Sequence, residues 1–378
     1  MRRLAFPALL IGACAAPQAQ EAPAPDPTQA EVPLPALSGW RGALVIDNGK
    51  TGIWTVKSFD FFPRYGCPEV IGLDDKGVCH VLYSYSGKWT PIPMVHDGQW
   101  LGGLDHGDVD PRIPGAELYT GGLGGTLWQL VPHLTRHVDA RLIGLTPGAE
   151  IHTIVAAGSE LYLFTAPGAL WLSTPTGPDG RFETRKLEEL PGRVRDAVLL
   201  PARSGTPPRI ATASRAGRLE LLELAPEGRR WTTLHQESMG MGRLALRRGP
   251  PLVLYSTLDD GRLMRHEEGP DGSWRAETIY LGPQGHRGVA AGRFDADPNV
   301  ETVAVFGYSH KVELLTRTAH GWKAETIFED RDKGHWLSTA ELDGRNSTDE
   351  LLASGYGGRI VLLARPPGSG RTELAVAP

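Results

Sequence analysis

The sequence predicts an all-β fold, a seven-bladed β-propeller whose blades are four-stranded antiparallel sheets. The first observation is a recurring pattern: a strand of small residues, an acidic turn, a strand that opens with Glu, a Gly turn and an aliphatic strand. The second is a short strand with Trp or Phe near its start, which follows most copies, as in GKWTPIPMV and HGWKAETIF. The third is the abundance of turn formers, 47 Gly and 31 Pro in 378 residues, which is typical of many short strands.

The spacing of the copies sets the number of blades. The clearest copies are residues 106–130, 285–317 and 334–365, and weaker copies fill the rest of the chain from residue 52 onward. Four strands in about 40 to 50 residues is the period of a propeller blade, and seven such units follow one another. A single four-stranded sheet leaves two apolar faces open, whereas stacked blades cover them.

The ring needs a closing strand, and the N-terminal part of the chain supplies a candidate. The segment ALVIDNGKTGIWTV matches ETIFEDRDKGHWLS in spacing, which gives Trp54 and Trp336 the same position in the repeat. Gly42–Asp47 is therefore predicted to be the outer strand of the last blade, paired with Arg359–Arg365. The alternative is that the C-terminal segment RTELAVAP takes that edge.

The first residues resemble the export signal of a bacterial lipoprotein. Two arginines precede an apolar run that is too short to span a bilayer, and IGAC ends in Cys14, as in a lipobox whose Cys is acylated. The alternative is an ordinary signal peptide with an incidental Cys. We expect a signal peptide over residues 1–13, a disordered Pro- and Ala-rich tether over 14–38 and one propeller domain over 39–378. A residue other than Asp after Cys14 favours the outer membrane of the cell envelope.

The acidic turns DVDPRIPGAE, DADPNVE and DGRNSTDE resemble those of FG-GAP or VCBS-type propeller repeats, whose fuller Asp-rich loop often binds calcium. The resemblance implies calcium as a cofactor at the acidic residues of these turns: Asp108, Asp110, Glu117, Asp295, Asp297 and Asp343. Each loop supplies only two or three carboxylates, whereas calcium takes six or more oxygen ligands. The alternative, which we favour, is structural: the carboxylates accept hydrogen bonds from backbone N–H groups of the turn. The same turn wording also resembles propeller polysaccharide lyases.

Two further cysteines, Cys67 and Cys79, form a candidate disulfide. An exported protein folds under oxidising conditions, which favours the bridge. A hairpin of Glu69–Leu73 and Val78–Tyr83 would not place the two residues opposite each other, which argues against it. Both alternatives stay open.

The inner strand of each propeller blade lines the central channel, so polar residues at its start are candidate ligand-binding residues. Those at or near such starts are His152, His286, His335, Arg195, Arg287 and Gln99, with Arg193 and Arg243 at equivalent places. Converging imidazoles could hold a transition metal, and guanidiniums could bind an anionic sugar or a carboxylate. The alternative is that these side chains only face water in the channel.

Composition and motifs favour a binding protein. The net charge is −5 at pH 7 and no basic run carries interleaved aromatic residues, which argues against nucleic acid as a partner. The sequence has no G-x-S-x-G, HExxH or P-loop motif. We expect a monomeric, envelope-anchored binding or scaffold module for a glycan, an anionic ligand or a protein partner. The alternative is a carbohydrate-active enzyme, a polysaccharide lyase or hydrolase, that uses the channel His and Arg residues.

Overall fold

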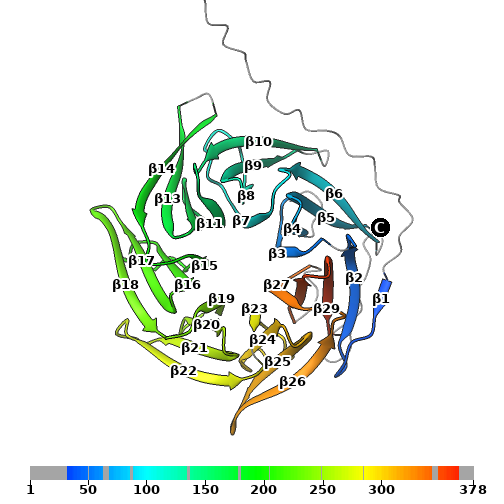
Figure 1. The fold of residues 1–378 in the computed structure, drawn as a ribbon. Coiled ribbons are helices and arrows are strands. Elements are labelled where there is room, and N and C mark those ends of the chain that lie inside the picture. Colours follow the sequence, from blue (N-terminus) through cyan, green and yellow to red (C-terminus); the bar gives the residue numbers. More distant parts are fainter. Residues whose placement is uncertain are drawn as a thin grey trace, which may run out of the picture.

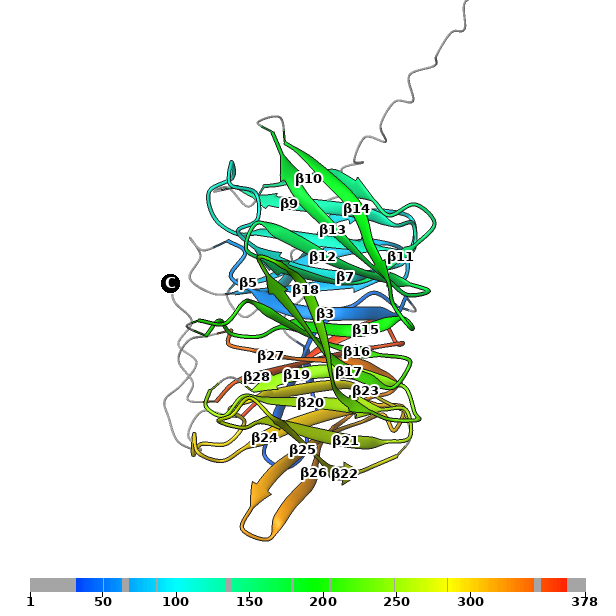
Figure 2. The same ribbon diagram turned by 90° about the vertical axis from the view of Figure 1, so that its left-hand side faces the viewer.

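The computed structural model describes residues 32–365 apart from residues 50, 63–67, 86–87, 134–136, 178–179, 204, 248, 284 and 343–347. This part of the chain forms 29 strands, and none of it is a helix long and apolar enough to cross a membrane. The strands form seven antiparallel sheets around a central channel (Figure 1), so the predicted seven-bladed β-propeller is confirmed. Figure 2 shows the ring from its side, with the sheets of successive blades lying on one another.

Each blade runs from an inner strand at the channel to an outer strand at the rim of the ring. The first two blades contain β3(Ile53–Phe59), β4(Glu69–Asp74), β5(Val78–Tyr85) and β6(Lys88–His96), and then β7(Leu101–Gly107), β8(Glu117–Gly122), β9(Thr126–Pro132) and β10(Val138–Leu145). The third and fourth contain β11(Glu150–Ala157), β12(Glu160–Ala166), β13(Ala169–Thr176) and β14(Arg181–Glu189), and then β15(Val194–Leu199), β16(Arg209–Ser214), β17(Arg218–Ala225) and β18(Gly228–Gln236). The fifth and sixth contain β19(Met241–Arg247), β20(Val253–Leu258), β21(Arg262–Glu268) and β22(Trp274–Leu281), and then β23(His286–Gly292), β24(Thr302–Gly307), β25(Lys311–Thr318) and β26(Gly321–Glu329). The seventh blade contains β27(Gly334–Ala340), β28(Glu350–Gly355) and β29(Arg359–Ala364), completed by β2(Arg41–Asp47) with β1(Val32–Leu34) outside it.

Burial along the strands follows from the stacking of the blades. Every residue of the second strands β8 and β24 is buried, because a neighbouring blade covers each face of the sheet there. Apart from the opening Glu117 of β8, these strands accordingly consist mainly of apolar and small residues, as in TVAVFG of β24. The outer strand β14 instead alternates between exposed and half-buried residues, since one of its faces meets solvent.

The hydrophobic core therefore lies between blades. One cluster joins Ile71 and Leu73 of the first blade with Leu104 and Leu118 of the second, and all four side chains are buried. Similar clusters join the other neighbouring blades. Truncation of such a leucine to alanine costs about 2–5 kcal/mol, so the ring depends on every interface between blades.

The closure of the ring confirms the prediction made from spacing. β2 pairs with β29 in an antiparallel ladder that joins Gly42 to Leu363 and Asp47 to Arg359. The N-terminal strand is thus the fourth strand of the last blade, as Figure 1 shows. Because Val45 is buried in the core shared by the first and last blades, the closure also covers apolar surface.

The predicted tether over residues 14–38 is wrong in its last part. Val32–Leu34 is the strand β1, which pairs with β2 and lies outside it (Figure 1). The backbone N–H of Leu37 donates to the carbonyl of Ile327 at 2.8 Å, and Leu34 packs against the core between the last two blades. The Pro-rich composition predicted no strand here, but β1 is an edge strand, and the edge of a sheet tolerates proline.

A glutamate at the start of the second strand ties the preceding turn to that strand within the same blade. Glu117 is fully buried and accepts hydrogen bonds from the backbone N–H of Val109 at 3.1 Å and the hydroxyl of Tyr119 at 2.9 Å. Glu69 accepts from the backbone N–H groups of Phe61 and Phe62 in the same way. These bonds support the structural interpretation of the acidic residues.

The sixth blade uses a different residue for the same purpose. Phe294 donates its backbone N–H to the hydroxyl of Thr302 at 3.1 Å, so Thr302 occupies the place that Glu117 takes in the second blade. The neighbouring Glu301 instead receives hydrogen bonds from Arg265 at 2.7 Å and Arg317 at 2.8 Å. The sequence repeat had aligned Glu301 with the other strand-opening glutamates, one residue away from the structural equivalent.

We expect Glu117→Ala to lower the free energy of unfolding by about 2 kcal/mol, because it leaves buried donors without an acceptor. The measurement is denaturant unfolding with and without a chelator, and Glu183→Ala on the exposed face of β14 is the control. The loss should be the same under both conditions. A chelator that destabilises the native sequence as much as the substitution does would instead assign the turn to calcium.

The other predicted acidic and cysteine residues differ in their surroundings. Asp110 is buried and binds Arg112, whereas Asp108 is exposed. Asp295 and Asp297 accept backbone N–H bonds within their own turn, at 3.0 and 2.9 Å. Asp343, Cys14 and Cys67 lie outside the described residues, and Cys79 is buried between the first two blades, where burial raises the pKa of its thiol.

Candidate functional site

The same irregularity marks the start of every inner strand. The ladder between the first and second strands of each blade contains a β-bulge there, with one extra residue on the inner strand. The residues at the bulges are Trp54, Gly102, His152, Arg195, Gly242, Arg287 and His335, and in the fifth blade the stretch without a ladder partner also includes Arg243. A bulge redirects a side chain away from the regular alternation of a strand, so the fold repeats one device seven times around the axis.

Six of these seven bulge residues line one cavity of about 290 Å³, at the end of the channel where the inner strands begin. The exception is Gly102, where a side chain would overlap the ring of Trp100, which lines the cavity in its place. The turns after the second strands add Arg215, Tyr308 and Tyr356. We call this end of the channel the arginine mouth.

Positive charge dominates the arginine mouth. No Asp or Glu is among the described residues of its lining, which contains five arginines: Arg193, Arg195, Arg215, Arg243 and Arg287. Asp259 stands beside the cavity and forms ion pairs with Arg195, at 2.8 Å, and with Arg287. One carboxylate therefore neutralises part of the charge of two guanidiniums.

Arg243 packs on a tryptophan ring at the arginine mouth. Its guanidinium carbon lies 4.3 Å from the centre of the Trp336 ring, and Nη1 donates to the carbonyl of Arg195. Burial lowers the pKa of Arg243 to about 10, although the nearby Asp196 opposes the shift. The side chain remains positively charged at neutral pH, so it adds to the positive charge of the lining.

Arg193 and Arg215 differ from the other three arginines in their contacts. Neither side chain forms a hydrogen bond or an ion pair with a residue that the structure describes, and the buried Nε of Arg193 lacks an acceptor. Burial, followed by the charges of Arg195 and Arg215, lowers the pKa of Arg193. Arg193 is half-buried, and the charge of Glu150 offsets only part of the effect of burial on its pKa. Because a partly buried cation without a paired anion is costly, Arg193 favours an external anion. Arg215 is exposed and adds a second positive charge beside it.

The two histidines of the arginine mouth are neutral. Burial, with the charges of Arg193 and Arg243, lowers the pKa of His152 to about 3. Burial and the charge of Arg243 hold the pKa of His335 well below its ordinary value, and its Nδ1 is 3.0 Å from the carbonyl oxygen of Trp54. The histidines therefore add polar edges to the cavity without adding charge.

Aromatic rings complete the wall of the arginine mouth. The rings of Trp54 and Tyr356 pack edge to face with their centres 5.0 Å apart, and those of Trp54 and His335 pack in the same way with their centres 4.2 Å apart. The hydroxyls of Tyr308 and Tyr356 are 3.1 Å apart. Flat rings beside guanidiniums suit a ligand that has both C–H faces and a carboxylate.

The structure thus brings together four of the six predicted channel residues, namely His152, His335, Arg195 and Arg287. His286 is absent from the lining: it is the ladder residue before the bulge, and its ring stacks on Tyr280 at 5.8 Å between the strands. Gln99 lies in an exposed turn outside the cavity. The shared site predicted for His286 and His335 is therefore wrong, because neighbouring residues of a bulged strand point in different directions.

The repeat position assigned to the two tryptophans is also wrong. Ile53 pairs at the bulge of β3 as Gly334 does at the bulge of β27, so Trp54 corresponds to His335 rather than to Trp336. Trp336 is buried beneath Arg243. Alignment on the apolar residues that flank each bulge, rather than on tryptophan, would have found this register.

No group of three or more His, Cys, Asp or Glu side chains within the described residues is arranged to hold a metal ion. At the arginine mouth the two imidazoles share their surroundings with five guanidiniums. A divalent cation is repelled by that charge, so the donor set does not fit the transition metal expected from the histidines.

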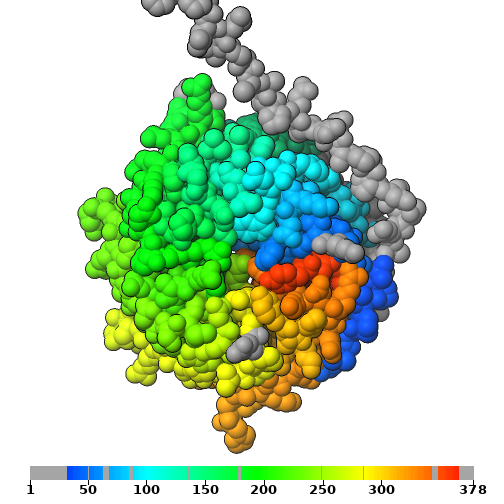
Figure 3. Space-filling view, in the orientation of Figure 1, coloured from blue at the N-terminus to red at the C-terminus, as the bar shows by residue number. Residues whose placement is uncertain are grey.

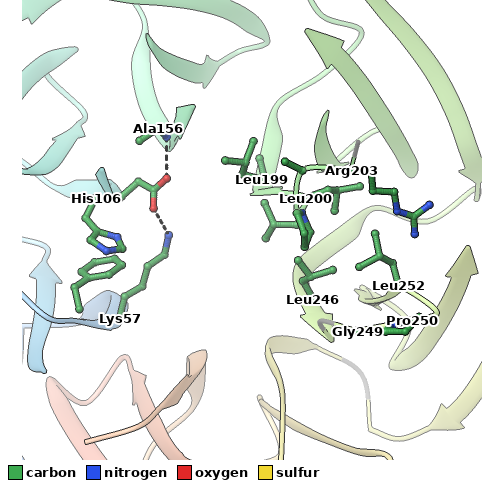
Figure 4. Close-up of a pocket in the computed structure, with 16 residues that line it drawn as sticks. Lys57, His106, Ala156, Leu199, Leu200, Arg203, Leu246, Gly249, Pro250 and Leu252 are labelled. Carbon is green, nitrogen blue, oxygen red and sulfur yellow. Dashed lines mark hydrogen bonds and ion pairs between the residues drawn. The ribbon is translucent and has the colours of Figure 1, made fainter. Parts of the chain in front are cut away.

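The opposite end of the channel has a different character. A cavity of about 760 Å³ lies where the inner strands end, and Figure 4 shows its two walls. Lys57 and His106 lie on one side; the other is largely apolar, with Leu199, Leu200, Leu246 and Leu252 beside Arg203. Lys57 forms an ion pair with Asp105 at 3.8 Å. The carboxylate therefore neutralises the charge of Lys57 at this end of the channel. Figure 3 shows one face of the ring, hollowed at its centre.

Comparisons with known proteins identify the architecture. The β-propeller domain of Cps50 (Swd1) from Myceliophteria thermophila matches with a TM-score of 0.57 and 14% identity, over 85% of this chain and 99% of that one. BBS1N in complex with ARL6DN matches at 0.58 and 12%, over 89% and 99%. A virginiamycin B lyase from Staphylococcus aureus matches at 0.58 and 12%, over 86% and 98%. These likenesses show the fold alone; no protein-family model and no curated protein matches the chain.

Proposed function

We propose that this protein is a binding module that takes a carboxylate-bearing ligand in the arginine mouth. The observation that carries the proposal is the pair of guanidiniums, Arg193 and Arg215, that line the cavity without a hydrogen bond or ion pair to any residue in the described part of the chain. A carboxylate accepts two parallel hydrogen bonds from one guanidinium. The cavity of about 290 Å³ is at the lower end of the range for small-molecule sites, so it fits one ring-sized unit.

Binding explains the arrangement better than acid–base catalysis by the channel histidines does. A general base works best with a pKa near the working pH, whereas that of His152 is lowered to about 3. The matched folds include a lyase and a protein in complex with a partner, so the architecture does not choose between enzyme and binding module. The pKa of the imidazole favours the binding module.

The test is calorimetric titration of the full chain with galacturonate and, as an uncharged match, galactose. We expect only the acid to bind, and Arg193→Gln to weaken binding about 10- to 100-fold, because one charge-assisted hydrogen bond contributes about 1.5–3 kcal/mol. Arg185→Gln on the exposed outer strand β14 is the control and should change nothing. Equal binding of galactose, or an unaltered affinity in Arg193→Gln, contradicts the proposal.

The proposed setting is the bacterial cell envelope, with the chain as a lipid-anchored FG-GAP or VCBS-type propeller. Support comes from the lipobox-like IGAC ending in Cys14 and from the acidic turns of the repeat. A single lipid anchor would leave the ring free to present the arginine mouth to an envelope glycan.

Replacement of Cys14 by serine tests this anchoring. We expect Cys14→Ser to move the protein from the membrane fraction to the soluble fraction of a bacterial host, because the acylated thiol is then absent. Fractionation followed by immunoblotting makes the measurement, with Cys79→Ser as the control that keeps the anchor. A variant that remains in the membrane fraction counts against a lipoprotein.

A further inference from the structure

A second cavity adjoins the arginine mouth on the same face of the ring. Its volume is about 400 Å³, and its lining consists of Ala166, Pro167, Pro191, Gly192, Arg193, Arg215 and Ala216. Arg193 and Arg215 also line the arginine mouth. The guanidiniums of Arg193 and Arg215 therefore lie between two cavities, and we call the outer cavity the rim groove.

The rim groove lies between the third and fourth blades. Its sides are the turn from β12 to β13, the connection from β14 to β15 and the turn from β16 to β17. Small residues line it where the loops approach closely: a Cβ on Gly168 would lie 2.9 Å from the backbone of Gly192, and a Cβ on Gly192 would lie 3.3 Å from the Cβ of Ala216. The backbones are too close for larger side chains, so the groove is shallow and has an uncharged floor.

From this continuity, and resting on the proposed function, we infer that the ligand is a chain: an acidic glycan whose end unit occupies the arginine mouth and whose next unit lies in the rim groove. The guanidiniums of Arg193 and Arg215 then lie between two successive units and bind the carboxylates of both. Methyl groups and proline rings of the groove face the C–H surface of the second sugar ring.

The backbone around the rim groove favours a glycan over an acidic peptide. An extended peptide is usually bound by main-chain hydrogen bonds to a strand edge. Here Leu190 donates to the carbonyl of Gly168 at 3.0 Å, and Arg215 donates to that of Arg193 at 2.9 Å. These groups are already paired within the fold, so side chains and ring faces supply the recognition.

The experiment compares the affinities of mono-, di- and trimeric uronates, using the galacturonate and mannuronate series, by calorimetry on the full chain. We expect a gain of about tenfold or more from monomer to dimer and little from dimer to trimer. Ala216→Trp fills the exposed rim groove without changing an arginine; it should abolish the gain and leave monomer binding unchanged. Ala276→Trp on the exposed strand β22 is the matched control and should keep the gain.

The outcomes separate the two proposals. Absence of binding by every uronate monomer and oligomer overturns the proposed function and this inference together. Monomer binding without a gain in the dimers of either series overturns the chain inference alone, as does a gain that survives Ala216→Trp. Oligoglutamate that binds as tightly as the uronates, with a gain that Ala216→Trp removes, overturns the glycan in favour of an acidic peptide.

Discussion

Deletion of residues 32–47 should destabilise the protein by about 5 kcal/mol or more. The deletion removes β1 and β2, and with them Trp40 and Val45, which are each 5% exposed and lie in two core clusters. Loss of a buried Trp alone costs about 3–5 kcal/mol, and the deletion also leaves β29 as an open sheet edge. For a domain of this size we expect the melting temperature to fall by about 7 °C or more.

Differential scanning calorimetry makes this measurement. The control is deletion of residues 15–31, which the composition predicts to be tether, and it should leave the melting temperature unchanged. A loss no larger than in the control would show that the ring closes without the N-terminal strand. Aggregation of the shortened protein, which the open edge of β29 favours, would support the closure.

His286 should make the fold sensitive to acid. Its side chain is buried, neither ring nitrogen has a hydrogen-bond partner among the residues that the structure describes, and burial lowers its pKa from 6.5 to about 4. Between these two pH values the unfolded chain takes up a proton that the folded chain does not, so stability falls as the pH falls. The contribution lost through this window is about 3 kcal/mol.

His286→Leu removes this contribution because leucine does not titrate. We expect the native chain to lose about 3 kcal/mol more than the variant between about pH 7 and about pH 4, as measured by urea unfolding. The exposed His320 provides the control, since His320→Leu should keep the acid sensitivity of the native chain. Identical pH profiles for the native chain and His286→Leu would show that the imidazole is protonated in the folded state.

The sequence predicted the architecture because blades are repeated units whose strands must alternate and whose second strands must be apolar. It also predicted the closing strand, since spacing between repeats survives when individual residues change. The strand β1 escaped prediction because Val32–Leu34 is only three residues long. Its position at the edge of a sheet depends on a partner, β2, rather than on a pattern of its own.

The site was predicted in part, and its error was one of local geometry. His286 and Arg287 are adjacent in sequence, but the bulge turns only Arg287 toward the axis. A repeat written as letters does not show which residue of a strand lies in a bulge. In the first three blades the flanking residues do: an apolar residue stands before the bulge and a small residue after it, as in IWT around Trp54 and IHT around His152.

A second repeat position was missed altogether. Arg215, Tyr308 and Tyr356 each follow directly after the second strand of a blade, as Asp259 does in the fifth. Turn residues are usually read as solvent-exposed connections, yet on a propeller this turn borders the channel. Alignment of the seven turns would have placed an arginine, an aspartate and two tyrosines around one opening.

The central claim is that the arginine mouth, rather than the opposite end of the channel, receives an anionic ligand. A crystal structure of the protein with bound digalacturonate tests it most directly. The account predicts a carboxylate oxygen at hydrogen-bond distance, about 2.7–3.2 Å, from the guanidinium of Arg193 or Arg215. A ligand seated between Lys57 and Leu200 at the other mouth would contradict it.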